Sequence, residues 1–183
     1  MPVTGMLKTE LKLPKGVTVK YEGGTLIFRG KEGEVVRRPE LGRIKMSVGE
    51  SISLTLDAPR RRELAVFNTI VSELKSAMEG AMNGFEYRLK IVYAHFPIKV
   101  QVKGNTVVIE NFLGERYPRY AAIVGSTKVT VSGDIVTVRS ADLEAAGQTA
   151  ANIERATRIK DYDKRVFQDG IYIIEKAGKV LVA

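Results

Sequence analysis

The stretch VTVKYEGGTLIFRGKEGEVVRR, residues 17–38, aligns without a gap onto IKVQVKGNTVVIENFLGERYPR, residues 98–119. The two stretches share six identities in 22 positions, where average residue usage gives roughly one or two by chance. The identical pairs are Val19/Val100, Gly23/Gly104, Thr25/Thr106, Gly33/Gly114, Glu34/Glu115 and Arg38/Arg119. This match indicates an internal duplication, which sets the architecture. It also supplies a control, because a feature that only one copy has is not required by the shared fold.

Each copy is predicted to contain a β-hairpin. Apolar and polar residues alternate in 17–21 and again in 98–102, as they do in half-buried strands. Gly23-Gly24 and Gly104-Asn105 follow, where a two-residue turn needs positive φ angles. The return strands are expected over Thr25–Arg29 and Thr106–Glu110.

A helix is predicted after the strands of each copy. In the first copy, apolar residues from Phe67 to Ala81 keep i, i+3, i+4 spacing, with Asp57 as the expected N-cap and Gly84 as the end. In the second copy, a narrower apolar stripe runs from Leu143 to Ile153. Because a helix with one apolar stripe must cover a sheet, the predicted fold class is α+β. The chain is expected to be a tandem duplication of two small domains, each an antiparallel β-sheet packed against one α-helix.

The domain boundary is predicted from a further strand, in which apolar residues alternate from Phe85 to Tyr93. We match this strand to Ile171–Ile174 in the second copy, which gives domains at residues 1–93 and 94–183. Counted from the equivalent threonines of the two helices, the matched strands begin 16 and 22 positions later. The second copy therefore carries six additional residues before this strand.

The charge balance favours a polyanionic partner. The net charge is +8 and the pI is about 9.7, with +5 in residues 1–90 and +3 in residues 91–183. A basic excess of this size indicates nucleic acid first. The absence of Cys excludes disulfides and thiolate metal sites and fits a reducing cytoplasm. With no apolar run of 18 residues and no signal-type apolar core at the N-terminus, neither a membrane span nor a secretory leader is expected.

Residues 155–169 have no counterpart in the first copy and show neither a helical nor a strand period. They combine five cations with three aspartates and the aromatic residues Tyr162 and Phe167. A long irregular loop in a compact domain is usually functional or disordered, and the apolar residues of this segment disfavour disorder. Basic side chains neutralise phosphates, and aromatic rings stack on unpaired bases. An ordinary solvated loop with self-paired charges is the alternative.

Three stretches carry a resemblance to a known family: NFLGERYPR at 111–119, VTVSGD at 129–134 and GQTAANIERATRIKDYDKRVFQDGIYI at 147–173. They resemble the archaeal form of the universal large-subunit ribosomal protein six family. The resemblance covers essentially the whole chain, including the duplication. It implies a structural, rRNA-binding component of the large ribosomal subunit in the cytoplasm, with two similar α+β domains.

The resemblance also implies where the RNA lies. In this family the second domain is the principal binder of large-subunit rRNA, near the sarcin–ricin loop and the base of the acidic stalk, where neighbouring ribosomal proteins and translation factors meet. Carried over to this chain, the RNA-contacting residues are Arg155, Arg158, Lys160, Lys164, Arg165, Phe167 and Gln168. The shared hairpin turn adds Arg116, Tyr117 and Arg119 as second-rank candidates.

No enzymatic site, cofactor, metal or small-molecule substrate is expected. His95 is the only histidine and has no catalytic partner nearby in the sequence. Gly30-x-x-Gly33 lacks the GK[ST] ending of a phosphate loop. The triple arginine 60–62 at a helix start is explained equally well by nearby phosphates and by a solvated face. Two other functions remain open: a protein–protein scaffold that uses its sheet edges, and a nucleic-acid hydrolase, which would need an acidic metal cluster that the sequence lacks.

Overall fold

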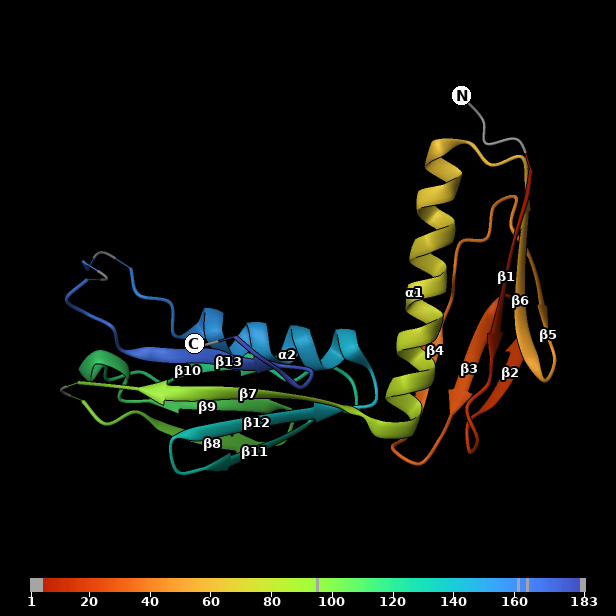
Figure 1. Cartoon of the computed structure of the whole chain (residues 1–183). Coiled ribbons are helices and arrows are strands. Elements are labelled where there is room, and N and C mark those ends of the chain that lie inside the picture. Colours follow the sequence, from red (N-terminus) through yellow and green to blue (C-terminus); the bar gives the residue numbers. More distant parts are fainter. Residues whose placement is uncertain (1–4, 95, 161, 164, 182–183) are drawn as a thin grey trace. The chain divides into compact units, whose positions relative to one another are not determined.

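The computed structural model describes residues 5–94, 96–160, 162–163 and 165–181. The chain forms two compact units that divide between Gly84 and Phe85 (Figure 1). Within the described residues each unit has one α-helix and two antiparallel sheets. The α+β class and the duplication are therefore confirmed, with two sheets in each unit where one was predicted.

The first unit contains two three-stranded sheets with the orders β1-β6-β5 and β2-β3-β4. In the β2–β3 hairpin, Glu22 pairs with Thr25 across Gly23 and Gly24, which both have positive φ, so the predicted turn is confirmed. The elements are β1 (Met6–Lys12), β2 (Thr18–Glu22), β3 (Thr25–Arg29), β4 (Glu34–Arg37), β5 (Lys45–Val48), β6 (Ser51–Asp57) and α1 (Arg61–Asn83).

Helix α1 buries the predicted apolar stripe, including Phe67 and Leu74. Gly84 ends it with a φ of 70°, as predicted, and its N–H donates to the Gly80 carbonyl at 2.9 Å. The predicted N-cap at Asp57 is wrong, because that residue ends β6. At the true start of the helix, the Arg60 N–H donates instead to the carboxylate of Glu63 at 2.8 Å.

The second unit contains a sheet of order β10-β9-β8 and a five-stranded sheet of order β11-β12-β7-β13-β14. Helix α2 packs on strands of both sheets (Figure 1). The strands are β7 (Phe85–Val92), β8 (Lys99–Lys103), β9 (Thr106–Glu110), β10 (Arg119–Ala122), β11 (Lys128–Ser132), β12 (Ile135–Ser140), β13 (Gly170–Lys176) and β14 (Lys179–Val180). The helices are α2 (Leu143–Ala156) and the short 3-10 helix Phe112–Gly114.

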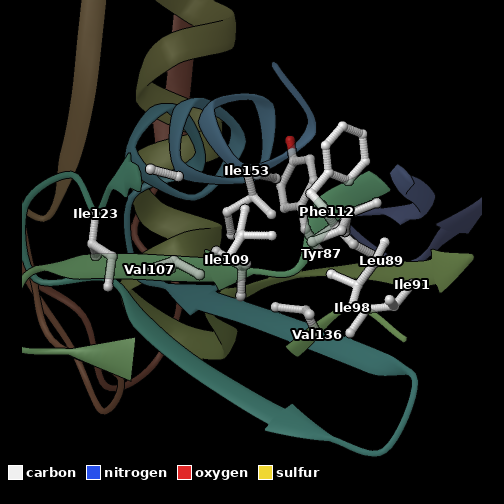
Figure 2. Packing of buried hydrophobic residues seen from close by; sticks show 14 of the residues in the cluster. Tyr87, Leu89, Ile91, Ile98, Val107, Ile109, Phe112, Ile123, Val136 and Ile153 are labelled. Carbon is white, nitrogen blue, oxygen red and sulfur yellow. The ribbon is translucent and has the colours of Figure 1, made fainter. Parts of the chain in front are cut away.

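The core of the second unit draws side chains from both sheets and from α2. Figure 2 shows Leu89 of β7, Ile109 of β9, Val136 of β12 and Ile153 of α2 in this cluster. All four are fully buried. Burying side chains of this size contributes about 1.5–3 kcal/mol each, so this cluster holds the two sheets and the helix of the unit together.

The strand β7 belongs to the second unit, although the sequence pattern placed it at the end of the first. It pairs with β12 on one side and β13 on the other. The matching of this strand to Ile171–Ile174 is therefore wrong, because those residues lie in β13, its neighbour in the sheet. Its counterpart is β1, since β1-β6-β5 and β7-β12-β11 have the same order. Alternation shows which residues of a strand face a core, but it does not show which strand lies beside it.

This corrected matching changes what lacks a counterpart. The count of six additional residues compared two strands that are not equivalent. The part of the second unit that the first does not repeat is everything after α2: an irregular loop at 157–169 and the strands β13 and β14.

Gly30, directly after β3, has no side chain and so allows the backbone to approach α1 closely. This packing explains the first glycine of the Gly30-x-x-Gly33 stretch, which does not match a phosphate loop. A Cβ at this position would clash with the carbonyl oxygen of Ala81. We expect Gly30→Ala to destabilise the first unit by about 1–3 kcal/mol through overpacking, and to lower Tm by about 5–20 °C. Gly49→Ala is the matched control, because nothing lies within 4 Å of its Cβ position. Equal melting temperatures for the two variants would contradict this explanation.

Candidate nucleic-acid interface

Residues 157–169 form the loop between α2 and β13, here called the α2–β13 loop, and both of its ends are fixed. At its start, the buried Thr157 hydroxyl accepts a hydrogen bond from the Ile171 N–H at 2.9 Å. At its end, the carboxylate of Asp169, which is only 3% exposed, accepts from the Ala94 N–H at 3.1 Å. Ile159 is buried in the core between them. The loop is therefore irregular, as predicted, and attached to the rest of the unit at three points.

A turn that begins at Asp163 lies in the middle part of the loop, away from its two fixed ends. The Asp163 carbonyl accepts from the N–H groups of Val166 at 3.1 Å and Phe167 at 2.9 Å, and its carboxylate accepts from the Arg165 N–H at 2.9 Å. The rings of Tyr162 and Phe167 pack with their centroids 4.8 Å apart. Backbone groups that are bonded in this way give a turn with a defined shape.

Four of the predicted cationic contacts are exposed at this loop: Arg155 in the last turn of α2, and Arg158, Lys160 and Arg165 beyond it. Within the described residues, their side chains make no ion pair and no hydrogen bond. Lys164, the fifth predicted cation, lies outside the described residues. The alternative of a solvated loop with self-paired charges requires ion pairs between these cations and the loop's own carboxylates. The four described cations make no such pair within the described residues. Their positive charge is available to an anionic partner.

The aromatic residues of the loop divide into one that faces solvent and one that faces the core. Phe167, a predicted contact, is half-buried against the core cluster. Tyr162 is 56% exposed and was not among the predicted contacts. A ring that solvent reaches can stack on an unpaired base. Gln168, also predicted, is exposed, and its carbonyl accepts from the Tyr172 hydroxyl at 3.1 Å.

A hollow of about 270 Å³ lies where α2 ends. Arg155 and Arg158 line it together with Tyr172. Burial raises the pKa of Tyr172, and the nearby carboxylates of Asp169 and Glu154 raise it further. The tyrosine is therefore a neutral hydroxyl at neutral pH, and the two arginines supply the positive charge at this hollow. The lining residues are Glu154, Arg155, Thr157, Arg158, Ile159 and Tyr172.

The second-rank candidates do not share one environment. Arg116 is exposed, and Tyr117 is 85% exposed. Arg119 instead points into the fold: its Nε donates to Glu115 at 2.8 Å, and its Nη1 donates to the carbonyls of Ala156 at 2.8 Å and Arg158 at 3.3 Å. The hydrogen bond from Arg119 also holds the pKa of Glu115 below its usual range. The structure thus separates Arg119 from the exposed cations.

The stretch GQTAANIE, which carries much of the family resemblance, fastens α2 to the end of β10 and to the residues directly after it. Thr149 Oγ1 accepts from the Val124 N–H at 3.0 Å. Asn152 donates to the Ala122 carbonyl at 2.9 Å and accepts from Gln148 at 2.8 Å. Gly147 lies against the hydroxyl of Tyr87, which a Cβ would meet at 3.2 Å. This motif positions the helix from which the α2–β13 loop emerges.

Membrane-spanning helices and metal-binding clusters are absent from the described part of the chain. No helix there is long and apolar enough to cross a membrane. No group of three or more His, Asp or Glu side chains is placed to hold a metal ion.

The comparisons with known proteins identify the family to which the chain belongs. The sequence pattern of the family described as Ribosomal protein L6 matches residues 96–170, which include the α2–β13 loop. The large ribosomal subunit protein uL6 of Methanococcus vannielii is 45% identical over 185 residues, covering 99% of this chain and 100% of the relative. The chain therefore belongs to the ribosomal protein L6 family, whose members are structural and non-enzymatic.

Proposed function

We propose that this protein is a structural constituent of the large ribosomal subunit, on cytoplasmic ribosomes, and that its second unit binds large-subunit rRNA. The observation that carries this proposal is the group of four exposed cations at the end of α2 and on the α2–β13 loop, whose two ends are fixed. Phosphate contacts set the position of a protein on RNA, and an irregular loop fits irregular RNA better than a regular element does. Membership of the family supports the same function.

We place the contact near the sarcin–ricin loop and the base of the stalk, in the region where translation factors dock. There the protein would support the local RNA fold and lie beside neighbouring ribosomal proteins. The position is the one that the family resemblance implies. Arg116 and Tyr117 are the secondary contacts in this proposal, since both are exposed. No cofactor or small-molecule substrate takes part.

The binding function is tested by sedimentation of the protein with large subunits at increasing salt concentration. We expect the protein to stay bound at low salt and to leave at high salt, because released counterions drive phosphate binding. Binding that does not respond to salt would favour the alternative protein–protein scaffold.

The location is tested with single-cysteine variants, which the absence of native Cys makes possible. A hydroxyl-radical source tethered at Gln168→Cys should cleave rRNA at the stem of the sarcin–ricin loop. The same source at Lys12→Cys in β1 is the control and should give a different pattern. Cleavage from position 168 only at distant rRNA sites would contradict the proposed location.

A further inference from the structure

The guanidinium of Arg119 is almost fully used inside the protein. Of its five N–H groups, the one on Nε and one of the two on Nη2 donate to the two carboxylate oxygens of Glu115. Those on Nη1 reach the carbonyls of Ala156 and Arg158. The guanidinium also stacks over the Phe112 ring at 4.3 Å, and the side chain is only 26% exposed. An arginine that binds phosphate needs N–H groups that face the ligand. Four hydrogen bonds to protein groups already use most of the N–H groups of Arg119.

The two carbonyls that Arg119 holds lie at the point where α2 becomes the α2–β13 loop. The last carbonyls of a helix have no partner within the helix, so a cation placed there fixes the direction in which the chain leaves. Arg155 and Arg158, two of the exposed cations, lie one residue before Ala156 and two residues after it. Any rotation of the backbone at this point would move both side chains.

We propose that Arg119 and Glu115 form a clamp that sets the start of the α2–β13 loop in its RNA-binding shape, with Arg119 as a positioning residue and not a phosphate contact. This inference rests on the proposed rRNA binding. Ordering a flexible loop on binding costs conformational entropy, and a loop that is already ordered in the free protein avoids this cost. The clamp therefore raises affinity without touching the RNA.

The role of Glu115 gives the clamp an unusual signature. Removing a negative charge from a protein normally strengthens its binding to a polyanion. If Glu115 is half of the clamp, Glu115→Gln weakens rRNA binding instead, because the guanidinium loses its charged partner. Arg119→Lys keeps the positive charge but loses the two-pronged contact and the stacking, so we expect it to weaken binding almost as much as Arg119→Ala.

The test uses the full-length protein and these three variants, with Arg38→Lys as the control at the equivalent, exposed arginine of the first unit. Backbone order parameters measured by NMR on the free protein report the clamp directly. At residues 158–160 we expect them to fall from values of a rigid backbone, about 0.85, toward about 0.6 in the variants. Affinity for a large-subunit rRNA transcript should fall about 10-fold, with an unchanged salt slope. The control should change neither quantity.

Three results would overturn the proposal. Unchanged order parameters in Arg119→Ala would show that the loop is ordered without the clamp. Tighter rRNA binding by Glu115→Gln would show that only its charge matters. A salt slope shallower by about one in Arg119→Ala, with near-normal affinity in Arg119→Lys, would identify a direct phosphate contact. If the wild-type protein binds no rRNA, the proposed function fails, while the order parameters still decide whether the clamp orders the loop.

Discussion

Replacing Arg155, Arg158, Lys160 and Arg165 together with Gln should lower the affinity for large-subunit rRNA by about 100- to 1000-fold near 0.1 M salt. All four side chains are exposed and, within the described residues, without an ion-pair partner. Each phosphate contact contributes about 0.7–0.9 to the slope of log affinity against log salt. The slope of the variant should therefore be shallower by about three, as titrations at several salt concentrations would measure.

A variant with the same loss of charge elsewhere is the control. Lys8, Lys12, Lys15 and Lys20 are exposed residues of the first unit, and their replacement with Gln also lowers the net charge by four. If the contact is local to the α2–β13 loop, this variant loses far less affinity and keeps its slope. Equal losses would mean that only the overall positive charge attracts the RNA, and the assignment of the interface to the loop would be wrong.

The hairpins and helices could be predicted from the sequence because their signals are local. Gly23 and Gly24 lie directly between the strands that they connect, and the apolar stripe of α1 lies within one segment. The position of β7 could not be predicted in this way. Leu89 pairs with Val136 and with Ile173. Both partners are far from Leu89 in the sequence, so no local pattern around Leu89 indicates which strands lie beside β7.

The candidate site also has a part that the sequence predicts and a part that it does not. The exposed cations of the irregular segment could be predicted, since their charge and their place outside a regular pattern can be read within one stretch of sequence. The carbonyls that hold Arg119 lie 37 and 39 residues away. The sequence therefore could not distinguish Arg119, which is bonded inside the fold, from the exposed cations. The repeat does not reveal this role either. Glu115 and Arg119 recur as Glu34 and Arg38, but in the first unit Glu34 pairs with Arg29. The described residues of the first unit also have no equivalent of the α2–β13 loop.

The place of β7 leads to the second large expected effect, which concerns folding. We propose that the domain boundary lies at Gly84, so that a fragment of residues 85–183 folds alone and a fragment of residues 94–183 does not. Without β7, the strands β12 and β13 lose their common neighbour, and two unpaired edges are exposed. The core loses Tyr87, Leu89 and Ile91, which contribute about 5–9 kcal/mol together, comparable to the whole stability of a small domain.

Thermal unfolding followed by circular dichroism would check this expectation. Residues 85–183 should give one cooperative transition, whereas residues 94–183 should give none. The reciprocal pair is the control: a fragment of residues 1–93 should be no more stable than residues 1–84, because residues 85–93 have no strand to pair with there. They would instead leave an exposed apolar strand, which favours aggregation. A cooperative transition of residues 94–183 at the same temperature would mean that β7 is dispensable and that the boundary follows Tyr93.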